Sequence, residues 1–183
     1  MHLGGTLTIS PRLAPGPINP SKKRLTPMNL SGNYSYGTFQ DQKPGDIFIF
    51  TQDNSNYVGM RVVEKTSSGN FPHLAVIGGI GIKIVPEIHS PSVTPSKGVL
   101  SVQADTTIML YPQTKVPSEK AGTLYIGKTA RYLCARYGEA LGYINIDSGE
   151  WVRGLIMNDE WACDKWRLVL LHGNDATDLI DHR

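Results

Sequence analysis

Turn-forming residues interrupt the apolar runs of this chain at short intervals from Lys43 onward. Glycine, proline, serine and asparagine recur every few residues, so few stretches are long enough for an ordinary helix. The 19 glycines and 12 prolines among 183 residues favour short strands joined by turns. A chain of this length can bury a core without a metal or a disulfide framework. We therefore predict a mainly β, compact barrel or sandwich-like domain with at most one or two short helices.

The strand predictions follow from runs of β-branched and aromatic residues between these turns. Residues 53–56 and 147–150 are typical of hairpin turns, and residues 86–98, with three prolines, predict a long loop. Residues 175–183 are polar and are expected at the periphery. The predicted strands cover residues 47–51, 57–66, 73–77, 82–85, 99–104, 107–111, 123–126, 143–146, 151–157 and 166–171.

Residues 129–141 fit two descriptions. Apolar residues recur there at helical spacing, with Thr129 placed to begin a helix and Gly142 to end it. The aromatic residues Tyr132 and Tyr137 suit a strand as well. We predict a helix and keep a strand as the alternative.

The first 40 residues differ from the rest, which divides the chain into an arm, 1–40, and a β-rich domain, 41–183. Five prolines between residues 10 and 30 exclude a helix or a central strand, so the arm is extended. It holds four basic residues and no acid, a charge of +4. Because the whole chain carries +2, the other 143 residues carry −2.

A segment of this kind usually takes one of three forms: a disordered tail, a rigid spacer, or an arm that becomes ordered against a neighbouring molecule. Its spaced apolar residues favour docking on a neighbouring subunit, in a homo-oligomer or a larger assembly. Three clustered charges are few for binding nucleic acid, so direct contact with it is the less favoured use. The predicted partner-binding residues are Leu13, Ile18, Lys22, Lys23, Arg24, Leu25 and Met28.

The sequence indicates no cofactor, metal or membrane partner. No apolar run approaches the ~20 residues of a membrane helix, and the first ten residues do not resemble a secretion signal. We expect the protein to be synthesised in the cytoplasm. If it is an assembly protein, we expect it to be incorporated into a virion. The cysteines and histidines are too widely spaced for a zinc site. The glycines of residues 78–81 precede a strand-like run, so a turn fits them better than a dinucleotide loop.

Three short pieces bear on catalysis: residues 43–48, which read KPGDIF, residues 72–76, PHLAV, and residues 132–138, YLCARYG. Their order resembles that of circularly permuted papain-like hydrolases and acyltransferases. The resemblance implies a cysteine hydrolase in which His73 is the base and Cys134 the nucleophile on a helix. A buried structural cysteine is the competing interpretation.

The strand 45–48 followed by residues 57–62, YVGMRV, is also similar to the opening hairpin of some small β-barrel immunity proteins of bacterial toxin systems. That resemblance implies a binding module and leaves the arm without a role. The layout of domain and arm resembles that of virion proteins, particularly phage head-decoration and tail-associated subunits. We predict a non-enzymatic structural protein of this kind, with the immunity-type module and the hydrolase as alternatives.

Overall fold

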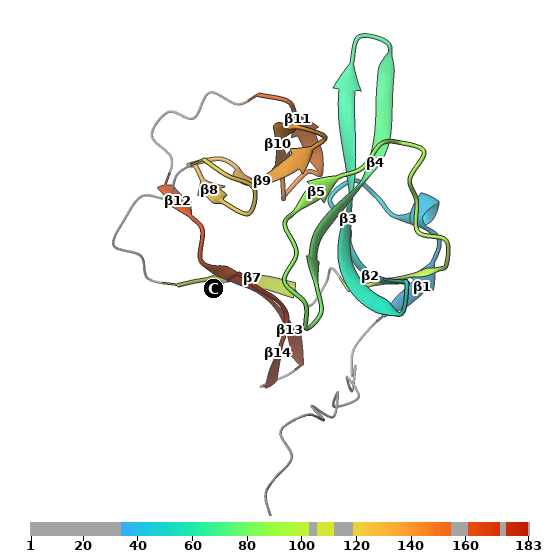
Figure 1. Ribbon diagram of the computed structural model, residues 1–183, viewed down its shortest axis with the longest axis vertical. Coiled ribbons are helices and arrows are strands. Elements are labelled where there is room, and N and C mark those ends of the chain that lie inside the picture. The colour runs from blue at the N-terminus through green and yellow to red at the C-terminus, as the bar shows by residue number, and fades with distance from the viewer. Residues whose placement is uncertain (1–33, 103–105, 112–118, 155–160, 173–174, 183) are drawn as a thin grey trace, which may run out of the picture. The chain divides into compact units, whose positions relative to one another are not determined.

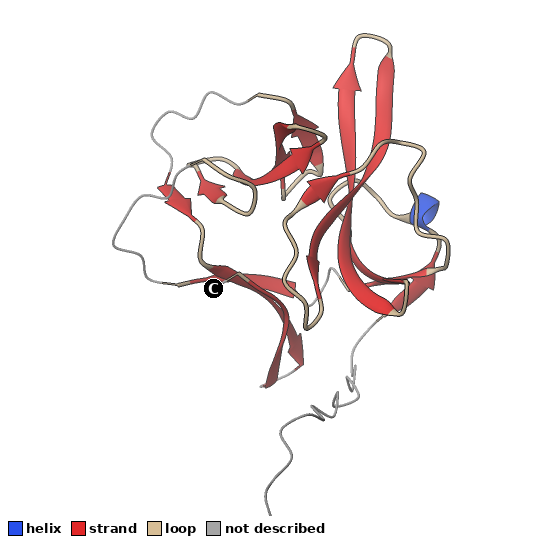
Figure 2. Ribbon diagram, viewed as in Figure 1, coloured by secondary structure: helices blue, strands red, loops and turns tan. Residues whose placement is uncertain are grey.

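The computed structural model describes residues 34–102, 106–111, 119–154, 161–172 and 175–182. Most of these residues lie in strands, and the mainly β prediction is confirmed (Figures 1 and 2). The one described helical element is a 3₁₀ turn, η1 (Phe39–Asp41). No helix in this part of the chain is long and apolar enough to cross a bilayer. The strands are β1 (Ser35–Gly37), β2 (Ile47–Gln52), β3 (Ser55–Thr66), β4 (Gly69–Gly79), β5 (Glu87–Ile88), β6 (Val99–Ser101), β7 (Thr106–Leu110), β8 (Leu124–Ile126), β9 (Arg131–Tyr137), β10 (Ala140–Asn145), β11 (Glu150–Val152), β12 (Trp161–Cys163), β13 (Trp166–His172) and β14 (Asp175–Asp181).

Six of the strands close into a barrel in the order β3-β11-β10-β9-β5-β4 and back to β3. Four of the six pairings are antiparallel. The other two, β3 with β11 and β5 with β9, are parallel and join segments distant in sequence. Closure leaves no free edge within the ring, which is the usual way in which a small β domain protects its backbone from pairing with other chains.

Strand β3 belongs both to the barrel and to an outer sheet, because β2 and β11 lie end to end along one of its edges. Strand β2 pairs with the first half of β3 and β11 with its second half. Between them, the turns at Gly45 and Gly149 touch: a Cβ atom on Gly149 would lie 2.0 Å from the Gly45 nitrogen. Both glycines have positive φ, 89° and 72°. Only glycine fits two turns so close together in this conformation.

Because successive side chains of a strand point to opposite faces of the sheet, one set of side chains points into the barrel. Register places Val62 opposite His73, Met60 opposite Ala75, and Ala75 in turn opposite Ile88. From the other half of the ring come Leu133 and Ala135 of β9, Ile144 of β10 and Trp151 of β11. All nine are at most 2% exposed, so the barrel is filled by side chains.

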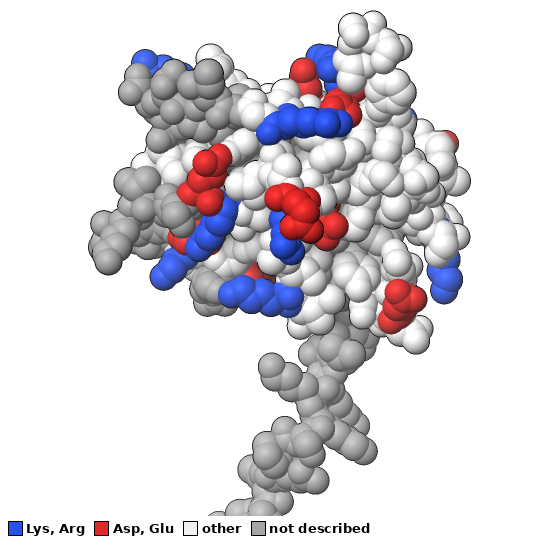
Figure 3. Space-filling view, turned by 45° about the horizontal axis from the view of Figure 1, so that its top comes forward, with Lys and Arg blue, Asp and Glu red and all other residues white. Residues whose placement is uncertain are grey.

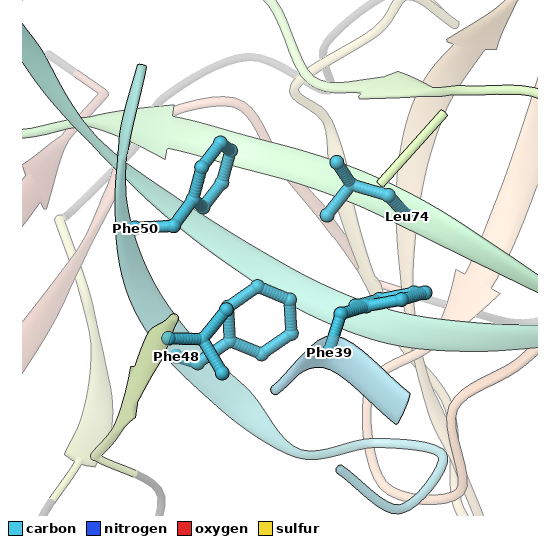
Figure 4. Close-up of a cluster of buried hydrophobic side chains, with 5 residues drawn as sticks. Phe39, Phe48, Phe50 and Leu74 are labelled. Atoms are coloured by element: carbon cyan, nitrogen blue, oxygen red, sulfur yellow. The ribbon is translucent and has the colours of Figure 1, made fainter. Parts of the chain in front are cut away.

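The other face of β3 and β4 carries an aromatic cluster that covers the barrel wall. Phe48 and Phe50 of β2 and Leu74 of β4 meet Phe39 of η1 (Figure 4). The ring centroids of Phe39 and Phe48 are 5.9 Å apart in an edge-on arrangement. Such a pair contributes about 0.5–1.5 kcal/mol beyond its buried area. Because Phe39 is 5% exposed, η1 is part of the folded domain.

Two smaller groups of strands complete the fold. Strands β8 and β12 extend the barrel from β9 and cover Cys134 and Tyr143 on its outer face. Strands β7, β13 and β14 form a separate three-stranded sheet. Strand β14 packs on β4, where Ile180 lies against Gly78 so closely that a Cβ atom there would be 2.5 Å from the isoleucine.

The β3–β4 hairpin continues beyond the barrel. The last pairing of β11 on β3 is Trp151 with Glu64, whereas β3 and β4 remain paired as far as Thr66 and Gly69. The hairpin projects clear of the other strands in Figure 1. Its residues 65–71 are all exposed.

Three sequence predictions are wrong. Residues 129–141 form β9 and the start of β10 rather than a helix. Residues 82–85 lie outside the strands, since the segment leaving β4 forms only an isolated bridge at Ile82. Residues 175–181, expected at the periphery, form β14, whose Leu179 and Ile180 are buried. The predictions at 47–51, 57–66, 73–77 and 166–171 match β2, β3, β4 and β13 within a few residues.

Candidate functional site

The arm residues predicted to bind a partner lie outside the described part of the chain. They are Leu13, Ile18, Lys22, Lys23, Arg24, Leu25 and Met28. The structure does locate the start of the folded domain. Strand β1 and η1, which the sequence analysis assigned to the arm or its boundary, pair with β6 and pack on the aromatic cluster. The arm therefore meets the domain close to Ser35.

Strand β1 is an edge strand. It pairs with β6 through Ser35, Tyr36 and Gly37, and the strand order of the described sheet ends with it. Its centre carries Tyr36, the most exposed large hydrophobic side chain of the described residues at 77%. The ring lies over the Gly98 backbone, where a Cβ atom would be 2.2 Å from it. An unpaired strand edge beside an exposed aromatic ring is a surface that another chain can extend.

His73 lies inside the barrel and is 1% exposed. Its Nδ1 is 2.9 Å from the carbonyl oxygen of His89, and because a carbonyl only accepts, Nδ1 donates. Its Nε2 lies 3.6 Å from an oxygen of Glu64. The other oxygen of Glu64 accepts from Arg153 at 3.1 Å. Trp151 meets the imidazole edge-on, 5.3 Å between centroids. These contacts make His73 part of the packing that closes one end of the barrel.

Cys134 lies on the opposite face of the barrel wall. Its neighbours Leu133 and Ala135 point inward, so Cys134 points outward, into a cluster with Tyr125 and Tyr143. Burial, and secondarily the negative charge of Glu119, raise the pKa of this thiol to about 12. A thiolate nucleophile needs the reverse, a lowered pKa, and the helix dipole expected from the sequence is absent because Cys134 is in β9.

The pair named by the hydrolase hypothesis is thus not brought together. His73 faces the barrel interior and engages Glu64 and His89, while Cys134 faces the outer cluster. A base must lie within hydrogen-bond reach of its nucleophile, and the sheet itself separates these two. In the part of the chain that the structure describes, no group of three or more histidine, cysteine or carboxylate side chains could hold a metal ion.

A cavity of about 340 Å³ lies between the barrel and the three-stranded sheet. The apolar side chains of Met60, Ile77 and Leu168 form part of its lining. Arg131 and Asp147 supply its charged groups among the described residues, and they are bound to each other through Arg131 Nε at 3.1 Å. The arginine lowers the pKa of Asp147. A carboxylate so engaged is a poor proton acceptor, so this cavity offers space without an evident acid or base.

Charges on the surface are mixed in sign. Figure 3 shows basic and acidic side chains side by side on the face that it draws. Several form cross-strand pairs, among them Lys65 with Glu150 and Arg167 with Asp178. A phosphate backbone would require a larger field of one sign, which this face does not offer.

The sequence analysis did not identify Tyr36 or the Arg131–Asp147 pair. The signal for Tyr36 was weak, because residues 31–37 hold two tyrosines among small and polar residues and nothing distinguishes one from the other. Arg131 and Asp147 are 16 positions apart, and the sequence gave no sign of their contact because only the β9–β10 hairpin brings them together. Comparison with protein-family models, curated proteins and solved structures found no match.

Proposed function

We propose that this protein is a non-enzymatic structural subunit whose N-terminal arm docks on neighbouring subunits of an assembly. The observation that carries the proposal is the edge strand β1 with its exposed Tyr36, at the point where the arm joins the domain. A neighbouring chain that adds to this edge would gain backbone hydrogen bonds from β1 and apolar contact from the tyrosine.

The composition of the arm supports the same proposal. Its prolines exclude a helix or a central strand, and its apolar residues are spaced along an extended segment. An extended segment with spaced apolar residues gains its buried area from another surface. If symmetry repeats this contact around an assembly, many weak contacts act together and hold each subunit with high avidity.

The class of assembly is part of the proposal. A closed barrel that carries an arm has the layout of virion components, and head-decoration or tail-associated subunits of phages are the candidates that we favour. This rests on architecture alone and assigns no residue a role by analogy.

The test is the mass in solution of the full chain and of a chain that lacks residues 1–30, measured by light scattering at the same concentrations. We expect an oligomer for the full chain and a monomer for the truncated one, with the free energy of unfolding of the domain unchanged. A truncated chain that does not fold would assign the arm to its own core. A full chain that stays monomeric at about 100 μM, far above the Kd of ordinary specific contacts, would contradict self-assembly.

Point variants locate the contact. Leu13→Asp, Ile18→Asp, Leu25→Asp and Met28→Asp should each lower the oligomeric fraction, and Tyr36→Ser should do so if the β1 edge takes part. The control is Leu171→Asp, which replaces an exposed leucine of β13 with the same acid. Association that survives Tyr36→Ser but not the arm variants would move the docking surface away from β1.

A further inference from the structure

A second cavity lies beside the residue that follows β14. It has a volume of about 490 Å³. Three segments contribute to it: residues 83–85 after β4, residues 120–122 before β8, and the turn between β12 and β13. The side chain of His182, just beyond β14, forms part of its wall. This volume is within the range of sites that take small molecules.

His182 is held in place by packing. Its ring stacks on Trp166, with centroids 4.6 Å apart and planes at 24°. The indole Nε1 of Trp166 donates to the carbonyl oxygen of Gly122 at 2.7 Å. Gly122 has φ of 95°, and a Cβ atom there would lie 3.1 Å from Cε1 of His182. The imidazole is therefore a fixed wall of the cavity, and Gly122 lets it approach the backbone.

Positive charge predominates around this wall. The cavity is lined by three lysines, Lys83, Lys120 and Lys165, and by one acid, Asp164, which accepts from Lys120 at 2.7 Å. Burial, followed by the charge of Lys83, lowers the pKa of His182, with Lys120 acting in the same direction and Asp181 opposing both. Burial is the larger cause, and the lysine charges act in the same direction.

The rest of the lining is apolar or uncharged. Ile84, Val85, Ala121 and Gly122 form it, and Val85 is 51% exposed. Lysines at the rim and aliphatic groups at the wall suit a ligand with an anionic head and a small organic body. Lysine binds phosphate as a point charge on a flexible stem, so three lysines can converge on one phosphate group.

We propose that the Lys83, Lys120, Lys165 and His182 cavity binds the phosphate group of a small organic molecule. The lysines supply charge to the phosphate, His182 donates a hydrogen bond when it is protonated, and the Val85 side of the cavity takes the organic part. A bound anion offsets the lysine charges that oppose protonation of His182. Binding and protonation of His182 therefore favour each other.

The experiment is an NMR titration of the histidine resonances of the full chain, with the His182 signal assigned by its loss in His182→Gln. Inorganic phosphate is compared with sodium chloride at equal ionic strength. We expect phosphate to raise the pKa of His182 by about half a pH unit or more, as a neighbouring anion does. The His89 resonance, which belongs to a residue outside this cavity, is the internal control and should not respond.

Two variants and a second ligand complete the test. Lys83→Gln and Lys165→Gln should each weaken phosphate binding about threefold or more, whereas Lys43→Gln, at the turn before β2, should not change it. Phenyl phosphate should bind more tightly than inorganic phosphate if the apolar wall is used. Equal affinities would assign the site to the inorganic anion. A His182 response to phosphate no larger than that to chloride, or one unchanged in the Lys83→Gln, Lys165→Gln double variant, would overturn the proposal.

Discussion

Gly149 occupies a position that no other residue fits without strain. A methyl group there would collide with the backbone of Gly45, and the positive φ adds ~1–2 kcal/mol for any side chain. We expect Gly149→Ala to lower the free energy of unfolding by about 3 kcal/mol, because the clash adds to the strain. Urea denaturation followed by tryptophan fluorescence measures it.

Gly138→Ala is the matched control. Gly138 also has positive φ, 58°, but no atom lies within 4 Å of a Cβ atom built on it. Only the backbone strain remains, so the expected loss is ~1 kcal/mol. Equal losses in the two variants would show that the contact between the two turns has no role in stability.

The buried thiol of Cys134 makes stability depend on pH in the alkaline range. The pKa of about 12 in the folded state exceeds the ordinary 9.0, so the unfolded chain loses this proton first as pH rises. Below pH 9 the contribution is complete, and between pH 9 and 12 it is lost at up to ~1.4 kcal/mol per pH unit. Cys134→Ser, which does not ionise there, should show a shallower fall in urea denaturation over this range. Parallel curves for the two proteins would contradict this prediction.

The residues of the candidate site were partly readable from the sequence. Trp151 and Trp166, each the first residue of a predicted strand, are buried in the core, whereas Trp161 is 48% exposed. Spacing could not reveal that His73 and Cys134 point to opposite sides of one sheet, because each sits in a run that is buried on both faces. When both faces are covered, apolar residues no longer alternate, and the direction of a side chain is hidden.

Among the elements, β14 docks on β4 of the barrel, and Ile180 packs there against Gly78. Gly78→Ala should cost about 2–3 kcal/mol through overpacking, and Ile180→Ala about 2–5 kcal/mol through a cavity. In the double variant the new methyl group fills part of the space, so we expect a loss at least ~1 kcal/mol smaller than the sum.

Leu74→Ala is the control for this double-mutant cycle, because its effect should be independent of Gly78→Ala. Leu74 is a buried residue of the same strand, but it belongs to the aromatic cluster on the other face of the sheet. Its cost should add to that of Gly78→Ala in urea denaturation. If the losses of unfolding free energy in Gly78→Ala and Ile180→Ala also add in the double variant, β14 does not dock through this pair.

Each error in the predicted elements has a physical cause. Strand β9 has three consecutive buried residues, Leu133, Cys134 and Ala135, because barrel and outer cluster cover its two faces. The period of two is lost there, and the remaining apolar residues matched a helix by coincidence. Strand β14 was missed for the opposite reason, since its two buried residues are adjacent within a polar run. Hairpins such as β2–β3, in contrast, were predictable because turn chemistry fixes both partners.

For the whole molecule, closure of the barrel depends on contacts that no local signal encodes. The parallel pairing of Val63 with Glu150 joins residues 87 positions apart, and that of Glu87 with Arg136 joins residues 49 apart. Loops of this size must close before these pairs form, which slows folding. We expect refolding in milliseconds to seconds, measured by stopped-flow tryptophan fluorescence on dilute full-length chain. A main phase faster than a millisecond would indicate that the ring closes through local contacts instead.

The projecting end of the β3–β4 hairpin has a practical consequence. Its turn at Ser67 and Ser68 is exposed, and the strands there pair only with each other among the described elements. Foreign sequence inserted between these two serines would leave each pairing of the ring intact. An affinity tag or a fluorescent label placed there would lie at the projecting end of the hairpin, so this turn offers a site for immobilising or imaging the protein with the arm left unmodified.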